Sequence, residues 1–306
     1  MDLMTIVFGV GVGILVGVSG MGGGTLMTPL LIVVLGVKPV TAVGTDIAYG
    51  AVSRTVGAWK HFKQGHVDLP LSTSMAIGSV PAAIVGVVAL QILKAHIGSE
   101  TNDIVVATLS GVLILTGVIT LGRILFIRRL GARERESAPT TRRTKRTAAA
   151  IGVAVGFMLG VTSAGSGALI GVALILVFRL VPRRVVGTDV FHASILLWAA
   201  TIAHVIAGNV DFGLAGTLLI GSVPGVWVGS VLSARVPQDS LRLVLSVVLL
   251  GSGLGLLTKA GASIPAPVIA AVPAFVAIVI VRAVVSRRRR AAEAAQHGER
   301  PAPAPA

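Results

Sequence analysis

Residues 18–31 read VSGMGGGTLMTPLL, and four glycines lie among the five positions from Gly20 to Gly24. Glycine is costly in a helix interior, so this cluster predicts a helix break in the middle of a strongly apolar run. In a lipid bilayer, a broken helix leaves backbone amide groups that hydrocarbon cannot solvate. A break at such a position therefore needs a reason.

The composition is that of a membrane protein. Apolar residues make up 54% of the 306 residues, charged residues only 12%, and the mean hydropathy is +0.91. A soluble domain carries about twice that share of charge. The apolar segments have the length of membrane-spanning helices and lack the alternating pattern of β-barrel strands. They therefore predict an all-α polytopic bundle. The predicted helices are 3–19, 24–37, 41–62, 70–91, 103–127, 147–164, 167–181, 184–206, 213–233, 239–258 and 264–286.

The net charge of +14 comes mainly from two basic clusters. The first lies at 123–146 and the second ends in SRRRR at 286–290, and both follow apolar spans. This pattern favours cytoplasmic loops under the positive-inside rule over nucleic-acid binding. The Pro/Ala-rich tail at 287–306 is predicted to be disordered.

Cysteine is absent, which excludes disulfides, thiol catalysis and thiolate metal sites. The His, Asp and Glu residues show no metal-ligand spacing, and no nucleophile–base arrangement is apparent. We therefore expect no cofactor, no metal, no catalytic residue and no enzyme activity. The N-terminal MDLMTIVFGV lacks a basic region, so we expect a retained first helix and not a cleaved signal peptide.

The chain contains an internal repeat. The triplet GTD at 44–46 recurs at 187–189, which is 143 residues later, and GSVP at 78–81 recurs at 221–224 with the same offset. The repeat predicts two homologous transmembrane halves with a linker, an extra helix and a tail. The predicted boundaries are 1–127 for the first half, 128–146 for the basic cytoplasmic linker, 147–258 for the second half, 264–286 for the helix and 287–306 for the tail.

Basic residues favour inverted over parallel halves. The linker and the tail arginines should both be cytoplasmic, which requires an odd number of crossings in each half. The N-terminus then lies outside the cytoplasmic membrane and the C-terminus lies inside. An even number would satisfy this only if 264–286 formed a hairpin.

The shorter loops agree with the inverted arrangement. Arg54, Lys60 and Lys63 precede GHVDL in the first half, whereas the equivalent stretch AHVIAGNVDF of the second half has no Lys or Arg. Equivalent loops thus differ in charge, as expected for an inverted repeat.

Both halves break at the same place, because SGMGGG at 19–24 is equivalent to TSAGSG at 162–167. Free N–H groups and the positive end of the dipole at a helix start can bind an anion, and glycine allows close approach. We therefore predict a mid-membrane anion site at the two breaks. The alternative is that the glycines serve close packing of helices. Whether the short helices beside the glycines cross the membrane or are re-entrant stays open. The predicted site residues are Ser19, Gly20, Gly22, Gly23, Gly24, Thr25, Thr162, Ser163, Gly165, Ser166 and Gly167.

Two aspartates lie in apolar segments, where charge is costly and typical of function. Asp46 and Asp189 each follow Gly-Thr, and either could be a coupling site for a proton or another cation. The alternative is a helix N-cap, which Thr and Asp also favour. The predicted coupling residues are Asp46, Asp189, Thr45, Thr188, Tyr49 and His192.

Two further pairs of ionisable residues favour structural roles. Asp68 and Asp211 precede apolar helices and are predicted to be N-caps. His61 and His204 lie fifteen residues after the two aspartates, about 22 Å along a helix, and are predicted to be interfacial. The isolated glycines Gly11, Gly13 and Gly117 are interpreted as packing residues.

With these motifs in place, the chain resembles the sulfite exporter TauE/SafE family of integral membrane proteins. The resemblance rests on the glycine-rich break, on AVGTD, on the GxVD turn and on GSVPGxxxG with its twin GSVPAAIVG, and it covers roughly residues 1–258. It implies transport of small sulfur-containing anions such as sulfite or organosulfonates across the cytoplasmic membrane.

The leading hypothesis is therefore an exporter of small sulfur anions that works by alternating access. Its expected partners are a small anionic substrate and the lipid bilayer, with a homo-oligomer left open and no nucleic acid. The alternative is a membrane-embedded scaffold whose basic loops bind a partner or anionic lipid.

Overall fold

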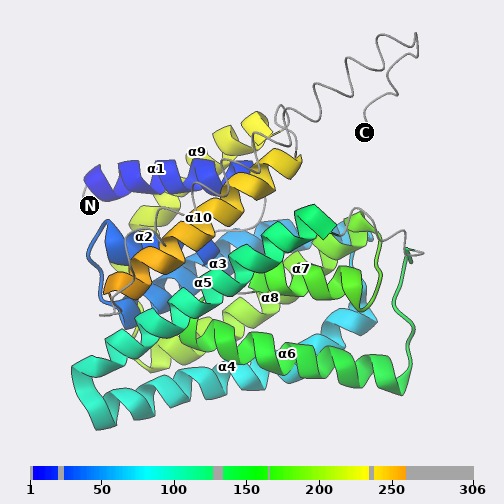
Figure 1. The fold of residues 1–306 in the computed structure, drawn as a ribbon, viewed down its shortest axis with the longest axis horizontal. Helices are drawn as coiled ribbons and strands as arrows, with labels where there is room; N and C mark the ends of the chain where they lie inside the picture. Colours follow the sequence, from blue (N-terminus) through cyan, green and yellow to red (C-terminus); the bar gives the residue numbers. More distant parts are fainter. Residues whose placement is uncertain (1–2, 20–23, 127–133, 165, 234–237, 260–306) are drawn as a thin grey trace. The chain divides into compact units, whose positions relative to one another are not determined.

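A computed structural model describes residues 3–19, 24–126, 134–164, 166–233 and 238–259. The described chain is helical and contains no strand, which confirms the all-α prediction (Figure 1). The helices are α1 Leu3–Ser19, α2 Gly24–Val33, α3 Pro39–Lys63, α4 Leu69–Ile97, α5 Thr101–Phe126, α6 Arg142–Thr162, α7 Ser166–Leu176, α8 Pro182–Ile206, α9 Phe212–Ser233 and α10 Gln238–Lys259, with a 3₁₀ turn at Gly98–Glu100.

Several helices suit a lipid environment. Among the described residues, four apolar helical stretches are long enough to cross a membrane: Leu69–Gly122, Arg142–Thr162, Pro182–Ile206 and Phe212–Leu232. Large apolar side chains such as Val56, Ile77, Val223 and Trp227 are exposed on the helices. Apolar surface of this kind is expected to contact lipid.

The two helices that follow the glycine breaks are shorter than predicted. α2 has 10 residues instead of the expected 24–37, and α7 has 11 residues instead of 167–181. A residue with positive φ, Gly36 or its equivalent Arg179, lies three residues after each helix ends. The N–H of the next residue bonds back into the helix: Val37 N donates to the Leu31 carbonyl oxygen, and Leu180 N donates to the Leu174 carbonyl oxygen. This geometry closes a helix by satisfying its last carbonyls.

The next helices begin at proline, and this is earlier than predicted. Pro39 starts α3 and Pro182 starts α8, because proline needs no N–H partner at a first helical position. The N-cap prediction for the following helices is confirmed. Leu71 N donates to Asp68 Oδ1 at 3.1 Å, and Leu214 N donates to Asp211 Oδ1 at 2.9 Å.

The helices of the two halves pack reciprocally. α1 packs on α9, and α6, the equivalent of α1, packs on α4, the equivalent of α9. α3 packs on its own equivalent α8, and α5 packs on α10. When the two halves are exchanged, each of these helix pairs maps onto another observed pair, as expected for two halves related by a twofold axis.

Glycines allow the closest of these contacts. A Cβ added to Gly13 would lie 2.5 Å from the Ser222 carbonyl oxygen, and one added to the equivalent Gly156 would lie 2.1 Å from the Ser79 carbonyl oxygen. Small residues permit such approach between membrane helices, where hydrophobic burial gives no driving force. The packing interpretation is confirmed for Gly13 and for Gly117, which faces Leu250, whereas Gly11 has no neighbour within 4 Å.

Gly156→Ala is expected to destabilise the protein by about 1–3 kcal/mol, because the new methyl group must separate α6 from α4. The control is Gly111→Ala on α5, where an added Cβ meets nothing within 4 Å and should be neutral or stabilising. Thermal unfolding of the two purified variants in the same detergent measures this difference. Equal unfolding temperatures would contradict the packing role.

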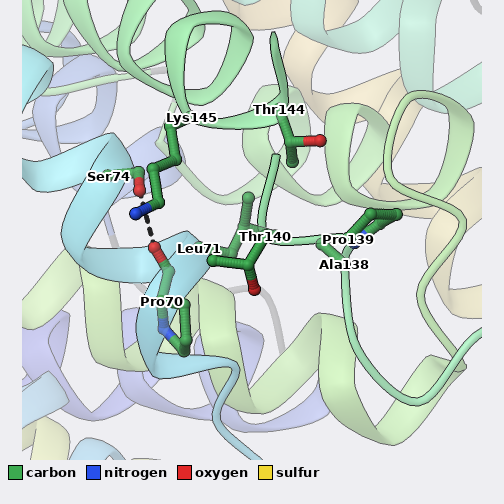
Figure 2. Close-up of a pocket in the computed structure, with 8 residues that line it drawn as sticks. All are labelled: Pro70, Leu71, Ser74, Ala138, Pro139, Thr140, Thr144 and Lys145. Atoms are coloured by element: carbon green, nitrogen blue, oxygen red, sulfur yellow. Dashed lines mark hydrogen bonds between the residues drawn. The ribbon is translucent and has the colours of Figure 1, made fainter. Parts of the chain in front are cut away.

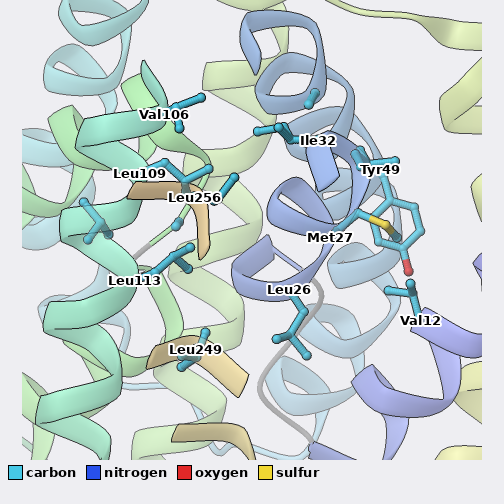
Figure 3. Packing of buried hydrophobic residues seen from close by; sticks show 14 of the residues in the cluster. Val12, Leu26, Met27, Ile32, Tyr49, Val106, Leu109, Leu113, Leu249 and Leu256 are labelled. Carbon is cyan, nitrogen blue, oxygen red and sulfur yellow. The ribbon is translucent and has the colours of Figure 1, made fainter. Parts of the chain in front are cut away.

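One apolar cluster joins helices of both halves (Figure 3). It includes Met27 of α2, Tyr49 of α3, Leu109 and Leu113 of α5, and Leu249 of α10. These side chains are buried among one another, so they hold the short α2 against the long helices. The cluster therefore positions the residues that follow the first glycine break.

Part of the predicted basic linker packs on the helical body. Residues 134–141 lie against the start of α4 and the α7–α8 connection, where Arg135 and Arg179 pair through backbone atoms at 2.8 Å. Ala138 N donates to Asp68 Oδ2 at 2.8 Å, and Glu136 forms an ion pair with Arg183. This stretch thus connects the two halves through specific contacts.

A pocket lies where this stretch meets the starts of α4 and α6 (Figure 2). Its lining includes Leu71, Pro139 and Lys145. α6 itself begins at Arg142, inside the predicted linker 128–146, so the end of that segment is helical. The predicted helix 264–286 and tail 287–306 lie outside the described residues.

Candidate functional site

Asp46 lies in the interior of α3, two turns after the helix begins at Pro39. The N-cap interpretation of Asp46 is therefore wrong, because the amides of this position are already bonded within the helix. Its side chain is only 1% exposed. A buried carboxylate that does not cap a helix needs partners elsewhere.

Those partners are two hydroxyl groups from different parts of the chain. Thr28 Oγ1 of α2 donates to Asp46 Oδ2 at 2.5 Å, and Ser163 Oγ donates to the same oxygen at 2.8 Å. The two hydroxyl oxygens lie 2.5 Å apart. We call these three side chains the oxygen triangle. Asp46 Oδ1, also buried, has no hydrogen-bond partner among the described residues.

Ser163 reaches Asp46 from the break that ends α6. It has φ +61° at the helix C-cap, in the left-handed region that few residues other than glycine adopt. The equivalent residue in the first half is Gly20, outside the described residues. A serine held in this conformation is strained, and such strain is typical of functional positions.

Thr28 was not among the predicted site residues. It follows the first glycine cluster by four positions and precedes Pro29 inside α2. A hydroxyl residue beside a proline in an apolar helix is a weak signal, since such residues commonly bond to their own helix. Only the packing of α2 on α3 brings Thr28 to Asp46.

Much of the predicted anion site falls at the breaks themselves. Gly20, Gly22, Gly23 and Gly165 lie outside the described residues. α2 starts at Gly24 and α7 starts at Ser166, so a helix begins directly after each break, as predicted. Of the remaining predicted residues, Ser19 ends α1, Thr25 lies in the first turn of α2, and Gly167 lies in the first turn of α7.

The Thr162 side chain bonds to the backbone at the end of its own helix. Its Oγ1 donates to the Met158 carbonyl oxygen at 2.7 Å, and the side chain is fully buried. This back-bonding satisfies a carbonyl near the end of α6. Thr162 therefore helps to shape the break next to Ser163.

Thr45 and Thr188, which the sequence predicts as coupling residues, each bond to the backbone of the opposite half. Thr45 Oγ1 accepts a hydrogen bond from Asp211 N at 3.0 Å, and Thr188 Oγ1 accepts one from Asp68 N at 2.9 Å. The two bonds are equivalent under the repeat. Each fixes the loop that precedes a helix of the other half.

Tyr49 and His192 also have equivalent partners. His192 Nε2 lies 2.9 Å from Ser79 Oγ, and the Tyr49 hydroxyl interacts with the side chain of Ser222. Ser79 and Ser222 both lie in the GSVP motifs. The two halves thus place a histidine and a tyrosine in corresponding polar contacts.

The two predicted aspartates differ in environment. Asp189 is half-buried and is not part of the oxygen triangle, whereas Asp46 is fully buried within it. Arg54, taken from the sequence as a loop charge, is instead only 8% exposed in the interior of α3. The predicted helix 41–62 already contained Arg54, but its burial depends on the neighbouring helices.

His204, predicted to be interfacial, is wholly buried in the protein. Its Nε2 lies 3.0 Å from the Gly160 carbonyl oxygen, and its Nδ1 lies 3.3 Å from Asn209 Nδ2. His204 lies in the last turn of α8, and α6 covers this side of the helix. His61, its equivalent in the first half, is only partly buried.

Comparison with known proteins extends these findings. A sequence profile described as "Sulfite exporter TauE/SafE" matches residues 5–256. No solved structure matches the chain.

Relatives with related names cover most of the chain. The "Probable membrane transporter protein YjnA" of Bacillus subtilis (strain 168) is 38% identical over 257 residues, which is 84% of this chain and 100% of that protein. The "Probable membrane transporter protein YdhB" of the same organism is 26% identical over 75% of this chain and 89% of its own length. Both names describe membrane transporters rather than enzymes.

Proposed function

The chain belongs to the sulfite exporter TauE/SafE family of membrane transporters, and from this premise we propose that it exports small sulfur-containing anions, such as sulfite or organosulfonates, across the cytoplasmic membrane. Transport would proceed by alternating access around a site between the two halves. The oxygen triangle is the observation that carries the proposal.

The triangle supports a site at the breaks because its members come from both halves. Thr28 belongs to the helix after the first break, and Ser163 belongs to the second break. Their hydroxyls meet on one buried carboxylate oxygen, that of Asp46. A movement of either half would change these bonds, so the triangle can respond to the transport step.

Charge gives the triangle a role in coupling. An anion and an ionised Asp46 repel each other strongly where little water screens them. Binding of the anion then favours the protonated carboxyl, and by linkage protonation favours binding of the anion. We therefore propose that proton occupancy of Asp46 and anion occupancy of the nearby breaks are coupled.

The reciprocal packing supports alternating access. Equivalent helices exchange partners across the halves, as α1 with α9 and α6 with α4. In an inverted repeat, exchange of the two conformations would convert an outward-facing site into an inward-facing one. The inverted orientation, with the N-terminus outside and the C-terminus in the cytoplasm, is part of the proposal.

The function is tested by flux into liposomes that contain the purified chain. Labelled sulfite and methanesulfonate should enter or leave faster than in protein-free liposomes, and an imposed pH gradient should change the rate. Absence of flux for every sulfur anion tested would favour the alternative role of a membrane scaffold that binds a partner or anionic lipid through its basic segments.

The inverted orientation predicts labelling from opposite sides. Because the chain lacks cysteine, Gln64→Cys after α3 and Ile206→Cys at the end of α8 can each be labelled alone. Both positions are exposed, and they avoid the equivalent turn glycines Gly65 and Gly208, whose φ of +67° disfavours a side chain. An impermeant thiol reagent on intact cells should label Ile206→Cys and should label Gln64→Cys only after permeabilisation. Labelling of both from one side would rule out inversion.

A further inference from the structure

Arg54 is a buried cation in a membrane-spanning helix. Its side chain is 8% exposed, and the other buried charged side chains within the described residues are those of Asp46 and Asp68. Burying a guanidinium group in a membrane is costly, so such a residue is retained where its charge is used.

The fold itself does not require a cation at this position. The equivalent residue of the second half is Leu197, an apolar side chain in the same α3–α8 interface. Its methyl carbon lies 3.4 Å from the position of a Cβ added to Gly50. The two equivalent helices thus pack on each other with leucine on one side and arginine on the other, so the charge belongs to the first half alone.

The register of α3 and α8 puts Arg54 opposite the polar part of α8. Gly50 faces Leu197 and Gly57 faces Val190, so the two helices run antiparallel and Arg54 lies between these contacts. The facing segment of α8, from 190 to 197, contains His192. The positive charge of Arg54 acts on both His192 and Asp46, which places the three groups in one electrostatic neighbourhood.

His192 supplies a second observation that points to a ligand. It is fully buried, its Nε2 bonds to Ser79, and its Nδ1 has no hydrogen-bond partner among the described residues. A buried ring nitrogen without a partner is costly unless a ligand or water completes it. The imidazole is thus held by Ser79 with its other nitrogen available.

We infer that Arg54, with His192 and Ser79, binds the negative charge of the transported anion at the α3–α8 interface. The guanidinium group can bind two oxygens of a sulfur oxyanion at once, and its charge does not depend on pH. The charge of Arg54 also acts on Asp46, so an anion bound at Arg54 and the Asp46 carboxylate compete for the same positive charge. This inference rests on the proposed anion transport and adds an anion position at the α3–α8 interface to the one proposed at the breaks.

The test is direct anion binding by the full chain in phosphatidylcholine nanodiscs, measured by calorimetry with sulfite and methanesulfonate. Arg54→Leu, which introduces the residue of the other half, should weaken binding at least about tenfold, as expected for loss of a charge-assisted hydrogen bond. Lys60→Leu removes an equal charge from an exposed position of α3 and should leave binding unchanged. Arg54→Lys, which keeps the charge but loses the planar fork, should lie between.

A neutral probe separates charge recognition from general damage. Dimethyl sulfone has the shape of methanesulfonate without its charge, so Arg54→Leu should lose the preference of the site for the anion over the sulfone. If Arg54→Leu does not fold, Arg54→Gln takes its place with the same expected result.

A folded Arg54→Leu or Arg54→Gln with the affinity of the unmodified chain would overturn the inference. Failure of the unmodified chain to bind either anion would overturn the proposed function, and with it this inference.

Discussion

Asp46→Asn is expected to abolish the dependence of anion flux on an imposed pH gradient. Asparagine can still accept the hydrogen bonds of Thr28 and Ser163 through its amide oxygen, but it has no titrating group. Binding coupled between two sites typically changes affinity by about 5- to 150-fold, and this is the factor that should be lost. Flux in proteoliposomes, measured with and without the gradient, gives the ratio directly.

The matched control is Asp189→Asn, the equivalent change in the second half. Asp189 is half-buried and outside the oxygen triangle, so its variant should keep a response to the gradient. Anion exchange at equal pH provides the second control, since Asp46→Asn should still exchange labelled for unlabelled substrate. If the Asp46→Asn protein responds to the gradient like the unmodified chain, Asp46 has no role in coupling.

Ser163→Gly is expected to impair transport strongly while leaving stability nearly unchanged. The substitution removes a hydrogen bond to a carboxylate, which costs about 1.5–3 kcal/mol. It also relieves the left-handed conformation at φ +61°, which costs a residue other than glycine about 1–2 kcal/mol. The two effects offset each other in the free energy of unfolding, whereas the lost hydroxyl contact with Asp46 is not replaced.

Ser163→Ala separates the two effects, because alanine loses the hydroxyl but keeps the strained Cβ. It should therefore unfold at a lower temperature than Ser163→Gly and transport equally poorly. Thr28→Val, which removes the other hydroxyl at similar volume, should be non-additive with Ser163→Gly because both hydroxyls bind one oxygen. Additive effects on transport would mean that Thr28 and Ser163 act separately.

The sequence by itself determined the membrane class, the helical architecture and the family, because these depend on properties that a linear pattern carries. Apolar runs of spanning length imply helices in a bilayer, where every backbone group must be bonded internally. The caps at Asp68 and Asp211 were equally predictable, since a cap depends on neighbours within one turn. The starts of helices after both glycine clusters follow from the same local rules.

Only the tertiary structure decided which polar residues meet. Thr28, Asp46 and Ser163 are separated by up to 135 residues, and their contact depends on how α2, α3 and the end of α6 pack. The burial of Arg54 and His204 likewise depends on the neighbouring helices, which periodicity along one helix does not reveal. Helix formation depends on hydrogen bonds within a few residues, whereas a site between two halves depends on close packing between distant segments. In this protein, glycine contacts of α1 with α9 and of α6 with α4 set that packing.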